Sequence, residues 1–178
     1  MTIHPGKTVP DTQLPLVGGG HYDTKAVGGY DFTLLVVYRG YHCPKCRDQL
    51  QELRDRLDAF ETQGTRVVAA SMDEEDRATL ARDEWDLGAL PVAYGLSEAA
   101  ARDWHLFLST SRGKTSMGVE EAATFAEPGL FLIRADGTLY AAWIQTVPFA
   151  RPKADDLVSM LKFVREKDYP ARGTKVAA

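Results

Sequence analysis

The chain carries two cysteines, and they lie three residues apart in the motif Cys43-Pro44-Lys45-Cys46. If two cysteines were placed at random in such a chain, roughly 1% of placements would give this spacing. A stabilising disulfide is a weak explanation, because chain-entropy stabilisation grows with loop length and this loop is very short. We therefore interpret the motif as a reactive pair of thiols.

The residues around the motif have the pattern of a buried strand followed by an amphipathic helix. Residues 32–38 form a continuous β-branched and aliphatic run, typical of a strand buried on both faces. Pro44 suits the first turn of a helix, where a missing N–H costs nothing, so Cys43 is predicted at the helix N-terminus. Apolar residues at steps of three and four then predict a continuous helix that ends near Gly64: Cys46, Leu50, Leu53, Leu57 and Phe60.

The rest of the chain alternates between strand and helix patterns. The sequence first predicts a strand at 65–70, a helix capped by Asp73 and running to about 85, and a short strand at 90–94. A helix capped by Ser97 follows and runs to about 106, and residues 109–127 are predicted as a loop with at most one short helix. The last elements are a hairpin of strands 130–134 and 138–144 around Asp136-Gly137 and a helix over 153–167. The first thirty residues, rich in Gly and Pro, predict a loop or short hairpin.

This order of elements predicts an α/β fold with a mixed central sheet. We expect a single domain over residues 1–178, built as a thioredoxin-like three-layer α/β/α sandwich. A leading segment of about residues 1–30 and a C-terminal tail of about residues 168–178 flank it. A CxxC pair that opens the first helix of such a chain is the thioredoxin-like redox arrangement.

A nucleophilic cysteine must be a thiolate, and an ordinary thiol with a pKa near 8.5 is only about 3% ionised at pH 7. At a helix N-terminus, unpaired backbone N–H groups and the helix dipole favour negative charge on Cys43. Four bases lie nearby in the sequence and add positive charge, with Asp48 opposing them: Arg39, His42, Lys45 and Arg47. We expect Cys43 to be the nucleophile.

Cys46 lies one helical turn further along and can attack a sulfenic acid or mixed disulfide on Cys43, as a resolving thiol. Two alternatives stay open. The cysteines could be inert buried thiols, since free Cys is often part of a core. They could also belong to a zinc site, although zinc needs four ligands and the chain has no second CxxC and no H-x₃₋₅-H pattern.

Charge and hydropathy exclude several classes of partner. With 25 acidic and 21 basic residues the net charge is −4, so the chain has no basic surface typical of nucleic-acid binding. Its longest apolar stretch, residues 34–38, is far too short to span a bilayer, which takes about 20 residues. Because the first residues also lack the apolar region of a signal peptide, we expect a cytoplasmic protein with neither a nucleic-acid nor a membrane partner.

Several motifs together resemble the peroxiredoxin-like branch of the alkyl hydroperoxide reductase and thiol-specific antioxidant family. They are Tyr38-Arg39-Gly40, Cys43-Pro44-Lys45-Cys46-Arg47, Glu127-Pro128-Gly129-Leu130-Phe131-Leu132-Ile133 and Asp136-Gly137, with tail motifs at 148–152 and 169–173. The resemblance covers roughly residues 10–173. It implies a thioredoxin fold, with Pro128 as the cis-proline that lies beside the reactive cysteines in such folds.

The chain also departs from that family. Peroxiredoxins carry Pro and Thr seven and three residues before the peroxidatic cysteine, where this chain has Val36 and Gly40. They also pack an arginine against that cysteine, and here Arg39 and Arg151 are the candidates. The C-P-x-C pattern itself is closer to thioredoxins and glutaredoxins, which exchange disulfides without a peroxide pocket.

The leading functional prediction is a thiol-dependent oxidoreductase that cycles between the Cys43/Cys46 dithiol and disulfide and reduces a peroxide or a protein disulfide. Its supporting residues are predicted to be Arg39, Gly40, His42, Pro44 and Pro128. We expect no organic cofactor and no metal, and a thioredoxin- or glutathione-type reductant. The alternative is a redox-sensing or binding module, in which the same disulfide switches a surface without turnover.

Overall fold

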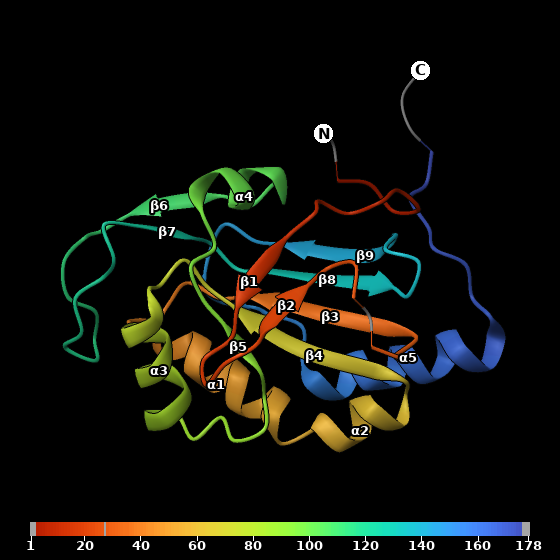
Figure 1. Cartoon of the computed structure of the whole chain (residues 1–178), viewed down its shortest axis with the longest axis horizontal. Coiled ribbons are helices and arrows are strands. Elements are labelled where there is room, and N and C mark those ends of the chain that lie inside the picture. Colours follow the sequence, from red (N-terminus) through yellow and green to blue (C-terminus); the bar gives the residue numbers. More distant parts are fainter. Residues whose placement is uncertain (1–2, 27, 176–178) are drawn as a thin grey trace.

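A five-stranded mixed sheet forms the centre of the computed structural model, which describes residues 3–26 and 28–175 (Figure 1). Its strand order is β5-β4-β3-β8-β9, with β3, β4 and β5 parallel, β8 antiparallel to β3, and β9 antiparallel to β8. The strands are β3 (Phe32–Val37), β4 (Thr65–Ala70), β5 (Val92–Ala93), β8 (Gly129–Arg134) and β9 (Leu139–Ile144). Residues 1–2 and 176–178 of the predicted flanking segments, and residue 27, lie outside the described part.

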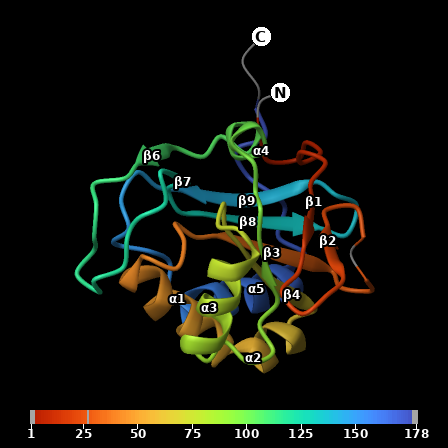
Figure 2. The ribbon, with the colours of Figure 1, turned by 60° about the vertical axis from the view of Figure 1, so that its left-hand side comes forward.

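Each face of the sheet is covered by its own layer, because side chains of a strand alternate between the two faces. Leu34 and Val36 of β3 pack with the apolar sides of four helices, which lie together below the sheet in Figure 1: α1 (Pro44–Arg54), α2 (Leu57–Thr62), α3 (Glu75–Glu84) and α5 (Ala154–Lys167). Leu35 and Val37 face the opposite layer, which holds α4 (Glu98–Asp103), above the sheet in Figure 2, and the hairpin of β1 (Gln13–Pro15) and β2 (His21–Asp23), at the right in that view. The predicted mixed α/β sandwich is confirmed.

The predicted continuous helix after β3 is interrupted. It begins at Pro44 as expected, but α1 ends at Arg54, and Arg56 has the non-helical dihedral angles φ −117° and ψ 11° before α2 begins. The Arg56 N–H donates to the Leu53 carbonyl three residues back, which tightens the last turn of α1. Both helices keep their apolar side toward the sheet, so the periodicity of the sequence continues across the break.

Residues 108–126, which we call the arm, contain two strands where the sequence predicted a loop. β6 (Leu108–Thr110) pairs antiparallel with β7 (Thr124–Ala126), and the arm projects from one end of the central sheet (Figure 1). Strands of three residues carry too little period-two pattern to be recognised without knowledge of their partner. The arm matters for function because it lies against the residues that surround the CxxC motif.

Candidate active site

Cys43 is the N-cap residue of α1 and lies just beyond the carboxyl end of the central strand β3. Its backbone carbonyl accepts hydrogen bonds from the N–H groups of Cys46 (3.1 Å) and Arg47 (3.2 Å), which form the first turn. Its own N–H donates to the Gly40 carbonyl at 3.1 Å. Both cysteines are free thiols and buried, with 1% of Cys43 and 0% of Cys46 exposed.

Gly40 is required by the backbone at this turn. Its φ is +132°, and a Cβ placed there would lie 2.8 Å from a carboxylate oxygen of Asp73. A threonine, which the family carries at this position, could not be accommodated without moving that carboxylate. Gly40 therefore shapes the turn before Cys43 and supplies no side-chain donor to a substrate.

Two arginines reach the thiol pair, one for each sulfur. Arg39 places Nη1 3.9 Å from Cys43 Sγ, and its backbone N–H donates to Cys46 Sγ at 3.3 Å. Arg151, which lies 105 residues beyond Cys46 in the sequence, donates from Nη2 to Cys46 Sγ at 3.2 Å. Both candidates from the sequence are thus at the site, and the structure divides them between the two cysteines.

The surroundings separate the pKa values of the two thiols. The hydrogen bond from the Cys46 thiol lowers the pKa of Cys43 to about 6, with help from the Cys46 backbone N–H and the positive charges of Arg151 and Arg39, against the effect of burial. Burial raises the pKa of Cys46 well above its ordinary value, and the neighbouring Cys43 raises it further. At neutral pH the pair therefore carries its negative charge on Cys43 and its proton on Cys46.

This separation predicts how the thiols react with an alkylating agent such as iodoacetamide. The alkylation rate of Cys43 should follow a titration with a midpoint near pH 6, because the pKa of Cys43 is lowered to about 6 and only the thiolate reacts. Quench-and-mass-spectrometry of each cysteine against pH measures it. A midpoint near 8.5 for Cys43, or faster alkylation of Cys46, would contradict the assignment.

Arg39 is held by buried acidic and aromatic groups of the arm and its neighbour Glu127. Its guanidinium lies 3.4 Å from the Glu127 carboxylate, 3.7 Å from Glu121 and 4.6 Å from the centre of the Phe125 ring. Ser109 donates to the other oxygen of Glu127 at 2.6 Å. Apart from Glu127, which belongs to a family-like motif, the sequence contains no local signal for these residues, because they come from the segment predicted as a loop.

His42 does not act as a cation, contrary to the prediction. It is fully buried, its ring lies 4.7 Å from the Phe125 ring, and its Nδ1 is 3.4 Å from Arg77 Nη2. Burial and the charge of Arg39 lower the pKa of His42 to about 4, so it is neutral at pH 7. His42 therefore packs against Phe125 of the arm and does not supply a positive charge that would stabilise the Cys43 thiolate.

The bases of the first helical turn are directed toward solvent. Lys45 and Arg47 both form ion pairs with Asp48, at 3.3 and 3.7 Å, and all three side chains are substantially exposed. Exposed pairs of this kind are strongly screened. Positive charge at the sulfurs comes from Arg39 and Arg151 instead.

Asp73 does not cap α3 as predicted. The N-cap of α3 is Glu74, while the buried Asp73 carboxylate accepts hydrogen bonds from the Tyr41 N–H (2.7 Å) and from Arg77 Nε (3.1 Å). Burial raises the pKa of Asp73, and these two donors oppose that shift. Asp73 thus fixes the turn of residues 40–42 that leads into Cys43.

The implied cis peptide bond at Pro128 is wrong: in the described ranges 3–26 and 28–175 every peptide bond is trans. The backbone runs extended from β7 into β8, with the Glu127 N–H bonded to the Phe107 carbonyl (2.7 Å) and the Pro128 carbonyl accepting from the Gln145 N–H (3.0 Å). Trans is also the intrinsically favoured isomer. The contact of this segment with the site is made by the preceding residue, Glu127, whose carboxylate lies 3.4 Å from the Arg39 guanidinium.

A mixed sheet of this topology, with a dithiol at the start of the helix after its central strand, defines a thioredoxin-like protein. The family model for the AhpC/TSA family matches residues 5–142. The chain belongs to this family, as a peroxiredoxin-like member of the thioredoxin superfamily. No curated protein matches the sequence.

Solved structures with the same fold include several peroxiredoxins. Peroxidoxin BcpB from Mycobacterium tuberculosis superposes with a TM-score of 0.71 at 17% identity, covering 92% of this chain and 99% of that one. The reduced 2-Cys peroxiredoxin of Plasmodium vivax gives 0.72 at 15% identity, covering 93% and 98%. Peroxiredoxin Q of Xanthomonas campestris gives 0.69 at 20% identity, covering 89% and 97%. At these identities the likeness concerns the fold.

The described residues also bear on metals and membranes. Within them, no group of three or more His, Cys, Asp and Glu side chains is placed to hold a metal ion. No helix in this part of the chain combines the length and apolar character needed to cross a membrane.

Proposed function

We propose that this protein is a thiol peroxidase and disulfide reductase in which Cys43 attacks the substrate and Cys46 resolves the product. Membership of the AhpC/TSA family supports a thiol-dependent antioxidant oxidoreductase. The observation that carries the finer proposal is the asymmetry of the pair, with Cys43 at a helix N-terminus and Cys46 one turn further along, holding the proton.

The proposed cycle follows from ordinary thiol chemistry. The Cys43 thiolate attacks one peroxide oxygen, the O–O bond breaks, and the alcohol or water leaves with a proton while Cys43 becomes a sulfenic acid. Cys46, as thiolate, then attacks Cys43 Sγ; the S–O bond breaks, water leaves, and the Cys43–Cys46 disulfide forms. A thioredoxin-type dithiol, or two molecules of a glutathione-type monothiol, returns two electrons and two protons. A reducing compartment such as the cytoplasm would keep this cycle running.

Peroxide reduction should be slower, relative to typical family members, than disulfide reduction. Removing one donor for the developing oxyanion costs about 10²–10³ in rate, and here Val36 is buried in the core while Gly40 has no side chain. Disulfide exchange needs no oxyanion pocket, only the thiolate, the resolving thiol and access, which for the 1% exposed Cys43 requires its sulfur to become exposed first. Stopped-flow oxidation by hydrogen peroxide gives the peroxide rate relative to that of a reference peroxiredoxin. An insulin reduction assay gives the disulfide rate relative to that of a reference thioredoxin.

A peroxide rate equal to that of the reference peroxiredoxin would contradict this ranking and would mean that Arg39, at 3.9 Å from Cys43 Sγ, rebuilds the pocket. Absence of both activities would overturn the proposed function.

A second candidate function uses the same buried pair of cysteines: a redox sensor that reacts once and changes its surface. The two functions differ in turnover. With reductant in excess, an enzyme consumes many equivalents of peroxide or disulfide per chain, whereas a sensor stops after one.

A further inference from the structure

The groups around the sulfur of Cys46 are hydrogen-bond donors that would stabilise a negative charge, although Cys46 carries the proton in the resting pair. Its residue is 0% exposed, yet the Arg39 backbone N–H (3.3 Å) and Arg151 Nη2 (3.2 Å) both donate to Sγ. A neutral buried thiol does not require a guanidinium, whereas a buried thiolate is costly without one. The arrangement therefore matches a state in which Cys46 is ionised.

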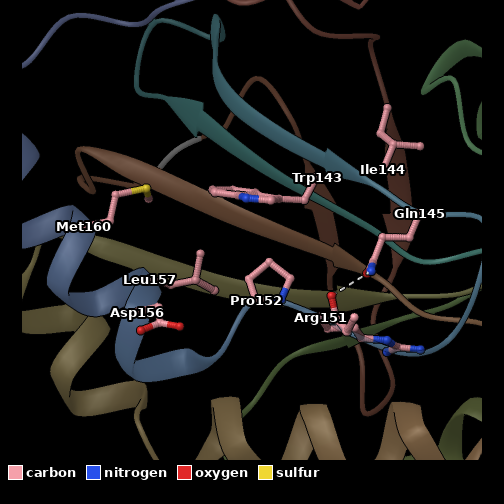
Figure 3. A pocket seen from close by; sticks show the side chains of 9 residues that line it. Trp143, Ile144, Gln145, Arg151, Pro152, Asp156, Leu157 and Met160 are labelled. Carbon is pink, nitrogen blue, oxygen red and sulfur yellow. Dashed lines mark hydrogen bonds between the residues drawn. The ribbon is translucent and has the colours of Figure 1, made fainter.

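Arg151 is held in place by hydrogen bonds from the two other nitrogens of its guanidinium. Nη1 donates to Gln49 Oε1 of α1 at 2.7 Å, and Nε donates back to the Pro148 carbonyl at 2.9 Å. Gln145 Nε2 donates to the carbonyls of Phe149 (3.0 Å) and Ala150 (3.1 Å), as the dashed line in Figure 3 shows for one of them. These bonds fix residues 146–153, which we call the strap, between β9 and α5.

Packing alone does not explain the position of the strap. Hollows of about 500 and 310 Å³ lie on either side of it, the larger one bordered by Trp143, Leu157 and Met160 (Figure 3). Ala150 also adopts a φ of +53°, which is unfavourable for a residue with a side chain. Specific polar contacts, above all those of Arg151, thus hold the strap over the thiols.

We propose that Arg151 is a catalytic residue: its guanidinium stabilises the negative charge that Cys46 Sγ carries whenever the Cys43–Cys46 disulfide forms or breaks. When the disulfide forms, the Cys46 thiolate attacks Cys43 Sγ and gives up its charge. When it breaks, a reductant thiolate attacks Cys43 Sγ, the S–S bond breaks, and the electron pair leaves on Cys46 Sγ, which then takes a proton. The second thiol of the reductant completes the exchange and releases Cys43.

This assignment rests on the proposed function and separates the roles of the two arginines. The negative charge of Cys43 raises the pKa of Cys46 in the resting pair, and it disappears once Cys43 is oxidised. Once Cys43 is oxidised, the positive charge and the N–H groups around Cys46 favour the Cys46 thiolate, and no negative charge on Cys43 opposes it. The charges of both arginines lower the pKa of Cys43 and so favour the first step. Only the guanidinium of Arg151 donates to Cys46 Sγ among the contacts described, and it serves the second step.

The test compares Arg151→Gln with wild type and with Arg172→Gln, an exposed arginine of the tail, as the matched control. At pH 8, where Cys43 is ionised, quenched-flow mass spectrometry follows sulfenic acid formation by hydrogen peroxide and then disulfide formation. Separately, protein oxidised with diamide is reduced with dithiothreitol. We expect Arg151→Gln to lower the rates of disulfide formation and disulfide reduction, each relative to sulfenic acid formation, about tenfold or more.

Arg151→Lys should restore part of both rates, because it returns the charge without the fork of donors, and Arg172→Gln should match wild type. Gln49→Ala, which removes the anchor of Arg151, should lower the same two rates to a smaller extent and covers the case of a misfolded Arg151→Gln protein. Equal losses in all three rates, or no loss in any, would overturn the proposal. A wild-type protein that diamide oxidises but peroxide does not would overturn the peroxidase function, while the dithiothreitol comparison would still decide the role of Arg151.

Discussion

Replacing Cys43 by serine is expected to abolish turnover of both peroxide and disulfide substrates, because serine at this position cannot supply a thiolate. Replacing Cys46 by serine should leave the first oxidation step intact and trap Cys43 as a sulfenic acid or a mixed disulfide. Intact-mass spectrometry after one equivalent of hydrogen peroxide, with and without a sulfenic acid trap, distinguishes these states. The turnover rate of Cys43→Ser is expected to fall to the background rate measured with a protein that has no thiols.

The two serine variants control for each other, since each removes one sulfur of similar burial from the same turn of α1. If Cys46→Ser were inactive in the first step while Cys43→Ser still formed a sulfenic acid, the roles of the two cysteines would be exchanged. Full cycling by Cys46→Ser with a monothiol reductant alone would show that the second thiol is dispensable.

The second large effect is expected at Arg39. Arg39→Gln removes the guanidinium 3.9 Å from Cys43 Sγ, and we expect the rate constant for hydrogen peroxide at pH 7 to fall about 10²-fold. The midpoint of the Cys43 alkylation titration should also move to higher pH, because the positive charge of Arg39 contributes to the lowered pKa of Cys43.

The same substitution leaves buried carboxylates without their cation, so it should also lower the free energy of unfolding by roughly 3 kcal/mol. The double variant Arg39→Gln/Glu127→Gln removes both charges of the 3.4 Å pair and separates the two effects. In chemical denaturation, the double variant should recover much of the free energy of unfolding that Arg39→Gln loses. Its rate constant for hydrogen peroxide should stay as low as that of Arg39→Gln. If the double variant recovered the rate as well, the contribution of Arg39 would be structural.

The local part of the site was predictable because it depends on neighbours in the sequence. A CxxC pair with Pro44 between its cysteines, after a buried apolar run, predicts a thiol at a helix N-terminus, and the structure has α1 begin there. Alternation of strand and helix patterns likewise predicted the mixed sandwich, because side-chain periodicity follows from backbone geometry. Short strands in the arm escaped prediction because their pairing partners, not their own residues, define them.

What the sequence alone determined is therefore the reactive motif, its place at the end of a central strand and the class of fold around it. Only the tertiary structure decided which charges act on the sulfurs. Lys45 and Arg47 are adjacent to the cysteines in sequence yet pair with Asp48 at the surface, whereas Arg151 reaches Cys46 from 105 residues away. The physical reason is that electrostatic effects depend on distance and burial in space, and burial is also what makes His42 neutral.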